Sequence, residues 1–432
     1  DAAVCYDAKA DDLMMCSLIK QDKTKNGALP LPVFLAFFSL VTTASGFSNS
    51  FIPAFLVSLQ LPGYMFGLVY AIASFMIFIL SPFWGKLSER IGRTRVIAAG
   101  CLGAACGQAL FCTATGAPQI IFARGVTGFF AGGFLVGCLS YGGDLCNLRG
   151  SSVPMACSAV VEGTSGAFAY LFGGLAAYRS IRLGFVCQIG LYLTAGLYAL
   201  LAMPETRQPE KKTGGRWPVR EANPFLSLVR LRHIEPWQTA VFWSILIAAC
   251  GGWMFESAFN YSISAFFSFS PLFNGVLKCG VGILNALVGA GVIRRLVRRG
   301  TIRGPLLLVG VLCMAASLLS ACSTDRAILF FPFSVCFLLI NSLNLPLHQA
   351  LLTTNKANLP VGELMGLFNA FRSIGQVAGS MVSGFSYTVG HALPFFCASA
   401  FFMMMVFILR WGTSGERKRH ANGGIKRRKK NG

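Results

Sequence analysis

Long apolar stretches, separated only by short charged turns, constrain this chain more than any other feature. Residues 64–84 and 96–114 are predominantly apolar runs, and the basic segment 85–95 joins them. A helix of about 20 residues matches the hydrocarbon thickness of a bilayer, and a charged turn has to lie where the chain re-enters water. The segment therefore predicts a transmembrane helical hairpin.

The composition of the whole chain agrees with a membrane protein. Apolar residues make up 54% and charged residues 12% of the 432 residues, and the mean hydropathy is +0.62. Soluble domains carry roughly 25% charged residues. We predict an all-α membrane protein with 12 transmembrane helices, at residues 31–57, 64–84, 96–114, 118–140, 153–177, 183–203, 237–263, 271–293, 305–322, 327–352, 362–388 and 391–411.

The distribution of Lys and Arg predicts the orientation of these helices. The net charge of +21 alone would be compatible with binding to nucleic acid. However, the loops on the side of segment 85–95, with the C-terminal tail, hold 27 basic residues, whereas the opposite loops hold three. By the positive-inside rule, we expect segment 85–95 and both termini to be cytoplasmic. The basic character is thus a topology signal, and no nucleic-acid partner is expected.

A polar segment divides the predicted helices into two groups of six. The basic loop Gly291–Gly300 follows the eighth helix, as segment 85–95 follows the second, so the groups are pseudo-repeats. Repeated halves around a central site are the usual architecture of secondary transporters. We predict a polar cytoplasmic segment at 1–30, a six-helix bundle at 31–203, a cytoplasmic linker at 204–236, a second six-helix bundle at 237–411 and a basic cytoplasmic tail at 412–432.

Six titratable side chains lie within the predicted helices. An ionised side chain at the bilayer centre costs about 3 kcal/mol on insertion scales, so each needs a partner or a function. None falls in the middle of the third, sixth, ninth or twelfth helix. The six are Arg124, Glu162, Glu256, Lys278, His348 and Arg372.

Uncharged polar residues follow helical spacing beside these charges. Steps of three and four residues place them on single helix faces. Hydrogen bonding between helices without any solute remains the alternative for each face, but five such faces together favour a hydrated cavity. The candidates for this solute or proton pathway are Asn49, Asn260, Asn341 and Asn344, together with the six titratable residues.

Opposite charges in this set suggest two ion pairs. Arg124 could approach Glu162 from a neighbouring helix, and Lys278 could pair with Glu256. Glu162 lies near the middle of its helix, so it is the better candidate for a proton site whose pKa is tuned by burial and a nearby cation. A permanent structural pair of Arg124 and Glu162 is the alternative, and Arg372 could meet an anionic group.

The spacing Gly-x-x-x-acid-Arg-x-Gly-Arg-x-Arg in segment 85–95 resembles the signature loop between helices 2 and 3 of the major facilitator superfamily. Gly85 would let two backbones approach, and Gly92 would permit a tight turn. The family usually has Asp where Glu89 stands. The resemblance implies a breakable charge cluster that gates the cytoplasmic side, formed by Gly85, Glu89, Arg90, Gly92, Arg93, Asp144 and Arg149.

Other segments resemble the drug:proton antiporter branch of that superfamily, which includes tetracycline-efflux-like carriers. They are Arg124-x-x-Thr127-Gly128-x-x-Ala131 and segments 144–150, 203–206 and 362–384. The resemblance covers residues 31–411. It departs at Ala169-Tyr170, where the branch usually has Gly-Pro, and at Asn49, where multidrug members often carry an acid.

We therefore expect a secondary active transporter that moves a small solute by alternating access. The resemblance implies proton-coupled efflux of drug-like compounds. Facilitated diffusion or symport of a sugar, an organic anion or another metabolite remains open, because nothing in the sequence identifies the solute. A polytopic membrane enzyme or a receptor is disfavoured, because no catalytic motif is present and 12 predicted helices exceed a receptor's seven.

The expected partners follow from the same class. They are a small-molecule solute, protons and the lipid bilayer, and we expect the chain to act as a monomer. The 15 cysteines are scattered singly through apolar runs, which is typical of packing residues. No catalytic residue, metal site or cofactor is predicted.

Overall fold

The computed structural model describes residues 29–149, 153–206, 236–298, 302–354 and 361–412. In these ranges the chain forms helices and no strand. The helices are α2 (Leu31–Gly46), η1 (Phe47–Ser50), α3 (Ile52–Ser58), α4 (Tyr64–Ile91), α5 (Arg93–Cys112), α6 (Ala117–Arg149), α7 (Val153–Arg179), α8 (Ile181–Leu201), α10 (Pro236–Ala265), α11 (Pro271–Arg298), α12 (Arg303–Cys322), α13 (Ala327–Asn341), α14 (Asn344–Thr354), α15 (Val361–Val389) and α16 (Leu393–Gly412).

These helices confirm the 12 predicted transmembrane segments, with small shifts at their ends. Within the described ranges, nine helices are long and apolar enough to cross a membrane by length and composition. Helices α7, α11 and α15 are not among the nine. The described apolar part of α11 covers Pro271–Leu287.

Two predicted segments are each broken into shorter helices, and a proline explains both breaks. Proline lacks an N–H and clashes with the carbonyl four residues before it. Pro53 thus opens the first segment at η1 and frees the carbonyl of Asn49, which accepts a hydrogen bond from Tyr70 Oη (3.5 Å). Pro346 likewise follows the break between α13 and α14, four residues after Ser342.

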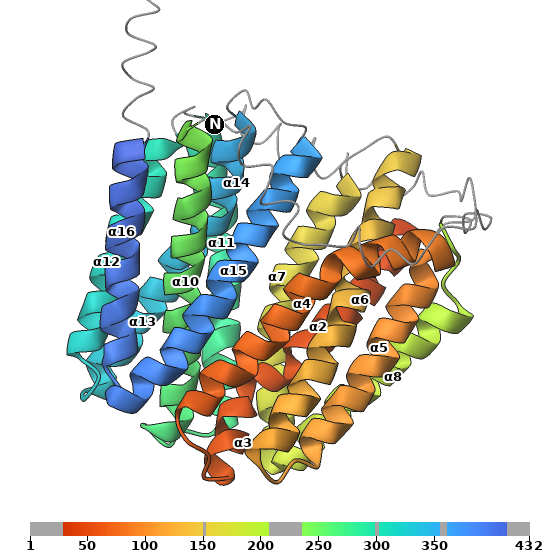
Figure 1. The fold of residues 1–432 in the computed structure, drawn as a ribbon, viewed down its shortest axis with the longest axis horizontal. Coiled ribbons are helices and arrows are strands. Elements are labelled where there is room, and N and C mark those ends of the chain that lie inside the picture. The colour runs from red at the N-terminus through yellow and green to blue at the C-terminus, as the bar shows by residue number, and fades with distance from the viewer. Residues whose placement is uncertain (1–28, 150–152, 207–235, 299–301, 355–360, 413–432) are drawn as a thin grey trace, which may run out of the picture.

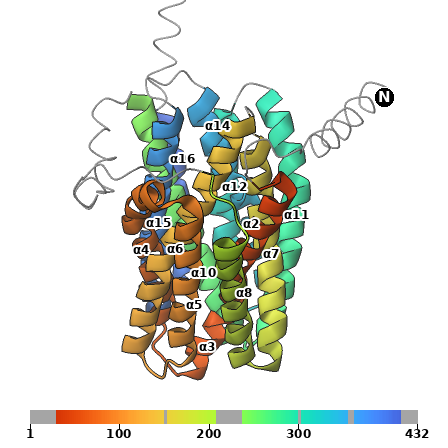
Figure 2. The same ribbon diagram turned by 90° about the vertical axis from the view of Figure 1, so that its right-hand side faces the viewer.

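The helices form two bundles that lie side by side, α2–α8 and α10–α16 (Figures 1 and 2). The second bundle has one large apolar core, whereas two clusters fill the first. Packing is repeated between the bundles: α5 contacts α6 and α8, as α12 contacts α13 and α16. This repetition confirms the predicted pseudo-repeat. The proposed linker at 204–236 and the terminal segments at 1–30 and 412–432 lie largely outside the described residues.

The bundles meet through two antiparallel helix pairs, α4 with α15 and α7 with α11. We call the side of the molecule that carries Gly92 the turn side, and the opposite side the far side. Close backbone contacts occur toward the far side, where α4 and α11 begin. A β-carbon on Gly275 of α11 would lie 2.5 Å from the carbonyl oxygen of Tyr170 in α7. A β-carbon on Gly384 of α15 would lie 2.6 Å from that of Tyr64 in α4.

Candidate functional site

The turn between α4 and α5 is a single residue, Gly92. Its φ of 103° lies in the region that favours glycine, which confirms its predicted role in a tight turn. Glu205 lies directly over this residue. Its carboxylate accepts hydrogen bonds from the backbone N–H of Arg93 (2.8 Å) and of Thr94 (3.1 Å), and from Thr94 Oγ1 (2.8 Å). Glu205 therefore caps the N-terminus of α5.

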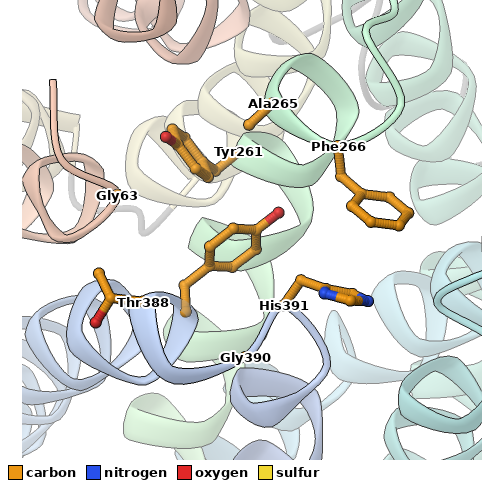
Figure 3. Close-up of a pocket in the computed structure, with 8 residues that line it drawn as sticks. Gly63, Tyr261, Ala265, Phe266, Thr388, Gly390 and His391 are labelled. Carbon is orange, nitrogen blue, oxygen red and sulfur yellow. The ribbon is translucent and has the colours of Figure 1, made fainter. Parts of the chain in front are cut away.

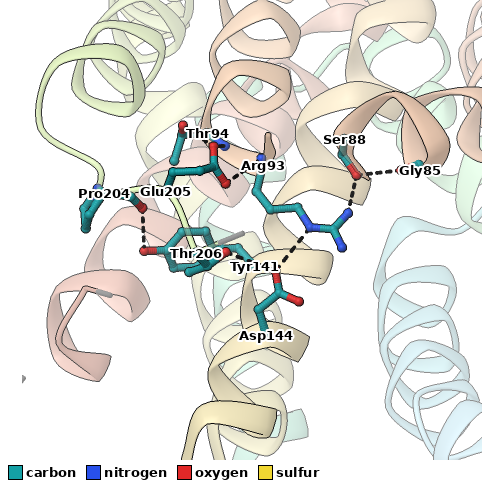
Figure 4. A network of polar contacts seen from close by, with 9 residues as sticks. All are labelled: Gly85, Ser88, Arg93, Thr94, Tyr141, Asp144, Pro204, Glu205 and Thr206. Carbon is teal, nitrogen blue, oxygen red and sulfur yellow. Dashed lines mark hydrogen bonds and ion pairs between the residues drawn. The ribbon is translucent and has the colours of Figure 1, made fainter. Parts of the chain in front are cut away.

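A buried arginine ties this turn to the end of α6. Arg93 Nε forms an ion pair with Asp144 Oδ2 (3.2 Å), and Arg93 Nη1 donates to Ser88 Oγ. Thr206 donates to the same Asp144 oxygen (3.0 Å), and Tyr141 Oη donates to the carbonyl of Pro204 (3.1 Å). The exit of α8 is thereby bound to α5 and α6 (Figure 4).

All of these contacts lie within one bundle, where Arg93 and Asp144 hold three elements of the first bundle together. The far side between the bundles is closed in this structure, so the predicted gate on the turn side stays a prediction. Gly85 differs from its predicted role, because a β-carbon there would lie 3.8 Å from Val136 Cγ1, an ordinary contact. Glu89 and Arg90 are exposed at the end of α4, and the side chain of Arg149 lies outside the described residues.

Replacing Gly92 with alanine is expected to destabilise the first bundle. A side chain at this φ costs about 1–3 kcal/mol, and the new β-carbon would also collide with the Glu205 carboxylate. The matched control is Gly85→Ala, because this helical position has room for a methyl group. Thermal denaturation in detergent should show a lower midpoint for Gly92→Ala alone, and equal midpoints would contradict this account of the turn.

A second group of charges lies between the bundles. Lys278 Nζ forms an ion pair with Glu256 Oε1 (2.9 Å), which confirms that predicted pair. The ammonium group also lies 5.4 Å from the ring centroid of Phe259 and 5.6 Å from that of Tyr170. Tyr170 comes from α7 in the first bundle, whereas Phe259 and Glu256 belong to α10 in the second. The pair is therefore part of the contact between the two bundles.

This ion pair lines a cavity of about 220 Å³. Polar groups of α11 and α13 form one wall, where Ser342 donates to Asn285 Oδ1 (3.0 Å). Small residues of α7 form the other wall. The remaining lining residues are Gly163, Gly166, Ala167, Tyr170, Val281, Gly282, Leu338 and Asn341. A polar, charged pocket at the centre of two repeated bundles is where secondary transporters bind their solute.

The predicted pair of Arg124 and Glu162 is not among the contacts of the described residues. Arg124 is 5% exposed; its Nε donates to the carbonyl of Val69 (3.3 Å), and its guanidinium lies over Tyr70 and Phe111. Helix α6 packs mainly against α4 and α5, whereas α7 packs mainly against α11 and α2. The charge of Glu162 acts instead on Arg372 of α15, in the opposite bundle.

Two other candidates are bound inside the second bundle. His348 is buried, with Nδ1 2.8 Å from the carbonyl of Asn344 and Nε2 3.1 Å from Ser244 Oγ. Asn344 is buried as well; its Nδ2 donates to Asn341 Oδ1 (3.1 Å) and lies 3.7 Å from Cys313 Sγ. These contacts favour the structural alternative for both residues. Asn341 itself lines the central cavity.

Aromatic rings close the far side between the bundles. Phe66 of α4 stacks on Tyr261 of α10 (centroids 4.3 Å apart), and Tyr261 meets Tyr387 of α15 edge-on (5.1 Å). Outside this layer lies a vestibule of about 550 Å³ (Figure 3). At its rim, His391 stacks on Phe266 and lies 3.2 Å from Asp325. In the part of the chain described here, no cluster of three or more His, Cys, Asp or Glu residues could hold a metal ion.

Two repeated helical bundles with charged groups between them define a membrane transporter. The sequence profile of the Major Facilitator Superfamily matches residues 33–380, and the chain belongs to this superfamily. It is a multi-pass integral membrane protein that moves a small molecule across the membrane, and it is not an enzyme.

Relatives of known function are similar over most of their length. Multidrug resistance protein 2 of Bacillus subtilis (strain 168) is 23% identical over 394 residues, which cover 90% of this chain and 94% of that protein. Among solved structures, the human organic anion transporter MFSD10 (TETRAN) has a TM-score of 0.61 at 16% identity. The match covers 88% of this chain and 98% of the MFSD10 chain. The nucleoside transporter NupG has a TM-score of 0.68 at 12% identity, with 89% and 100% covered.

The sequence analysis missed two residues that organise these sites. Tyr170 was noted only as a departure from a family pattern, yet its ring contacts the Lys278 ammonium. Glu205 was noted only as part of a motif, yet it caps α5. The signal for Glu205 was its place just after the end of a helix, where a carboxylate can reach the N-terminus of a neighbouring helix. No signal existed for Tyr170.

Proposed function

We propose that this transporter exports drug-like organic solutes in exchange for protons, by alternating access to the central cavity. The similarity to a multidrug resistance protein supports the class of solute. The charged lining of the cavity supports coupling to protons, since a proton carrier needs an embedded acid with a nearby cation. Far-side contacts between the bundles would separate in one half of the cycle and re-form in the other.

The orientation belongs to the same proposal. The excess of basic loop residues supports placing the turn side, the linker 204–236 and both termini in the cytoplasm. Export then moves solute from the turn side to the far side. Bundles at 31–203 and 237–411 would rock against each other, and a single chain would suffice as the working unit.

Glu162 is the proton site in this proposal. It precedes Gly166 by four residues, so it lies on the cavity face of α7, one turn nearer the turn side. Its charge acts on Arg372, which belongs to the other bundle. This electrostatic interaction between an acid of α7 and a base of α15, in different bundles, is the observation that carries the coupling. Protonation of Glu162 would remove an attraction between the bundles, so the proton would change the balance between the two open states.

The test is transport in proteoliposomes under an imposed pH gradient, with tetracycline and ethidium as solutes. Wild-type protein should exchange either solute for protons. Glu162→Gln should slow this uphill exchange by about tenfold or more, whereas solute-for-solute exchange without a gradient should persist. Asp325→Asn is the control, because it removes an acid at the far-side rim.

Three outcomes would overturn parts of the proposal. Wild-type transport that ignores the pH gradient would indicate a facilitator, and solute that moves with the proton would indicate a symporter. A Glu162→Gln protein that still exchanges solute for protons at the wild-type rate would remove Glu162 from the proton site. If the protein transports labelled sugars or organic anions but neither drug, its solutes belong to that class and are not drug-like compounds.

A further inference from the structure

We propose that Glu256 binds a positively charged nitrogen of the solute, and that Lys278 is an intramolecular competitor for the same carboxylate. The inference rests on the transporter function proposed above and assigns the solute's charge and binding site. Three observations carry it: the unequal exposure of the two charges, the surroundings of Lys278, and the empty space on α7 opposite them.

Both charges line the cavity, but the acid is the more exposed of the two. The side chain of Glu256 is 29% exposed, whereas that of Lys278 is 6% exposed. Oε1 of Glu256 accepts the Lys278 hydrogen bond, and among the described residues no other hydrogen bond to this carboxylate is found. A solute that enters the cavity therefore meets the carboxylate first. An organic cation can approach its second oxygen, whereas an organic anion would meet an ammonium that is mostly buried and already paired with Glu256.

The ammonium group of Lys278 lies beside the carboxylate of Glu256 and between aromatic rings. Its ammonium lies within 6 Å of the ring centroids of Phe259 and Tyr170, a distance at which cation–π attraction acts. These rings and Glu256 together compensate its burial. The ammonium thus stays beside Glu256 when the cavity is empty, and it weakens the attraction of the carboxylate for any second cation. A carrier needs this limit, because a solute that binds too tightly is not released.

The opposite wall leaves room for a solute. A β-carbon on Gly163 or on Gly166 of α7 would have no atom within 4 Å. Both residues line the 220 Å³ cavity together with Glu256. A larger side chain at either position would project into this space. The small residues of α7 therefore matter here because they face an open cavity with a charged group across it.

The experiment is calorimetric titration of the purified full chain in detergent at about pH 8, where carboxylates are ionised. The probes are benzyltrimethylammonium and its uncharged carbon isostere, neopentylbenzene. Wild type should bind the cation more tightly than the isostere. Glu256→Gln should weaken cation binding by about tenfold or more and leave the isostere unchanged. Lys278→Met should tighten cation binding, since the competitor is removed.

A second variant keeps the inference testable if a charge variant fails to fold. Gly166→Leu fills the cavity without changing either charge, so it should weaken the binding of both probes. Asp325→Asn should leave the affinity for both probes unchanged. Equal affinity of wild type and Glu256→Gln for the cation would overturn the inference, as would a preference of wild type for the isostere or no binding of the cation. Unchanged or weaker binding in Lys278→Met would overturn the role of Lys278.

The titration is independent of any gradient, so its failure is separable from failure of the proposed function. If the protein exports tetracycline against a proton gradient but does not bind the cation, the proposed function holds and the cation site at Glu256 is wrong. If the protein binds the cation at Glu256 but shows no proton-driven transport, the cation site holds and the proposed proton coupling is wrong.

Discussion

Gly275→Val is expected to abolish transport by wedging the far-side contact between the bundles. Gly275 of α11 packs directly against α7, because its Cα lies 3.2 Å from the position that a β-carbon on Gly174 would take. A β-carbon on Gly275 would lie 2.5 Å from the Tyr170 carbonyl oxygen, which is backbone and cannot rotate away. The helices would have to separate.

The size of the effect follows from overpacking. Extra methyl groups in a packed contact cost about 1–3 kcal/mol, and 3 kcal/mol corresponds to a shift of about a hundredfold between two states. The cost falls only on the state whose far side is closed, because the helices are apart in the other state. A carrier needs both states in each cycle, so solute flux should fall to the background of empty liposomes.

The control lies on the same helix. Gly280 is five residues further along α11, and a β-carbon there has no atom within 4 Å, so Gly280→Val should keep near-wild-type flux. Hydrogen exchange measured by mass spectrometry should show faster exchange in α7 and α11 for Gly275→Val alone. Wild-type flux in Gly275→Val would show that the far side does not need to close as it does here.

The sequence predicted the transmembrane helices well, because length and hydropathy decide them locally. A run of about 20 apolar residues has few alternatives in a bilayer, and the charged turns mark its ends. The breaks at Pro53 and Pro346 were equally local, since each proline acts on the carbonyl four residues before it. Neither break was predicted, although both prolines are plain in the sequence.

The partners of buried charges were harder to predict, because they depend on which helices are neighbours. Lys278 and Glu256 lie on consecutive helices of one bundle, and their pair was predicted correctly. Arg124 and Glu162 also lie on consecutive helices, yet α6 turns its arginine toward α4. Adjacency in the chain gave the same expectation for both pairs. Only the packing of α7 against α11 distinguishes them, and that packing is set by small residues far apart in the sequence.

Removing one partner of the Arg93–Asp144 ion pair should disable the carrier, and removing both should restore much of its stability. Arg93 is almost fully buried, so Asp144→Leu leaves its charge without a carboxylate, and Arg93→Met leaves Asp144 without its cation. Losing one partner of a buried pair costs about 3–5 kcal/mol, and the lower value applies because Asp144 is 21% exposed. The double variant has no unpaired charge at this position.

A double-mutant cycle of thermal stability and tetracycline flux separates a structural brace from a moving gate. Because the pair joins α5 to α6 within one bundle, it should behave as a brace, with a coupling energy of about 1–3 kcal/mol in stability. Flux should then follow stability, and the double variant should transport better than either single variant. If the pair were a gate, the double variant would be as stable as wild type but as inactive as the single variants. Glu205→Gln is the companion test, because it weakens the cap over α5 while it keeps the Arg93–Asp144 pair. Since Glu205 accepts a hydrogen bond from the Arg93 N–H, its loss of stability should be less than additive with that of either single variant.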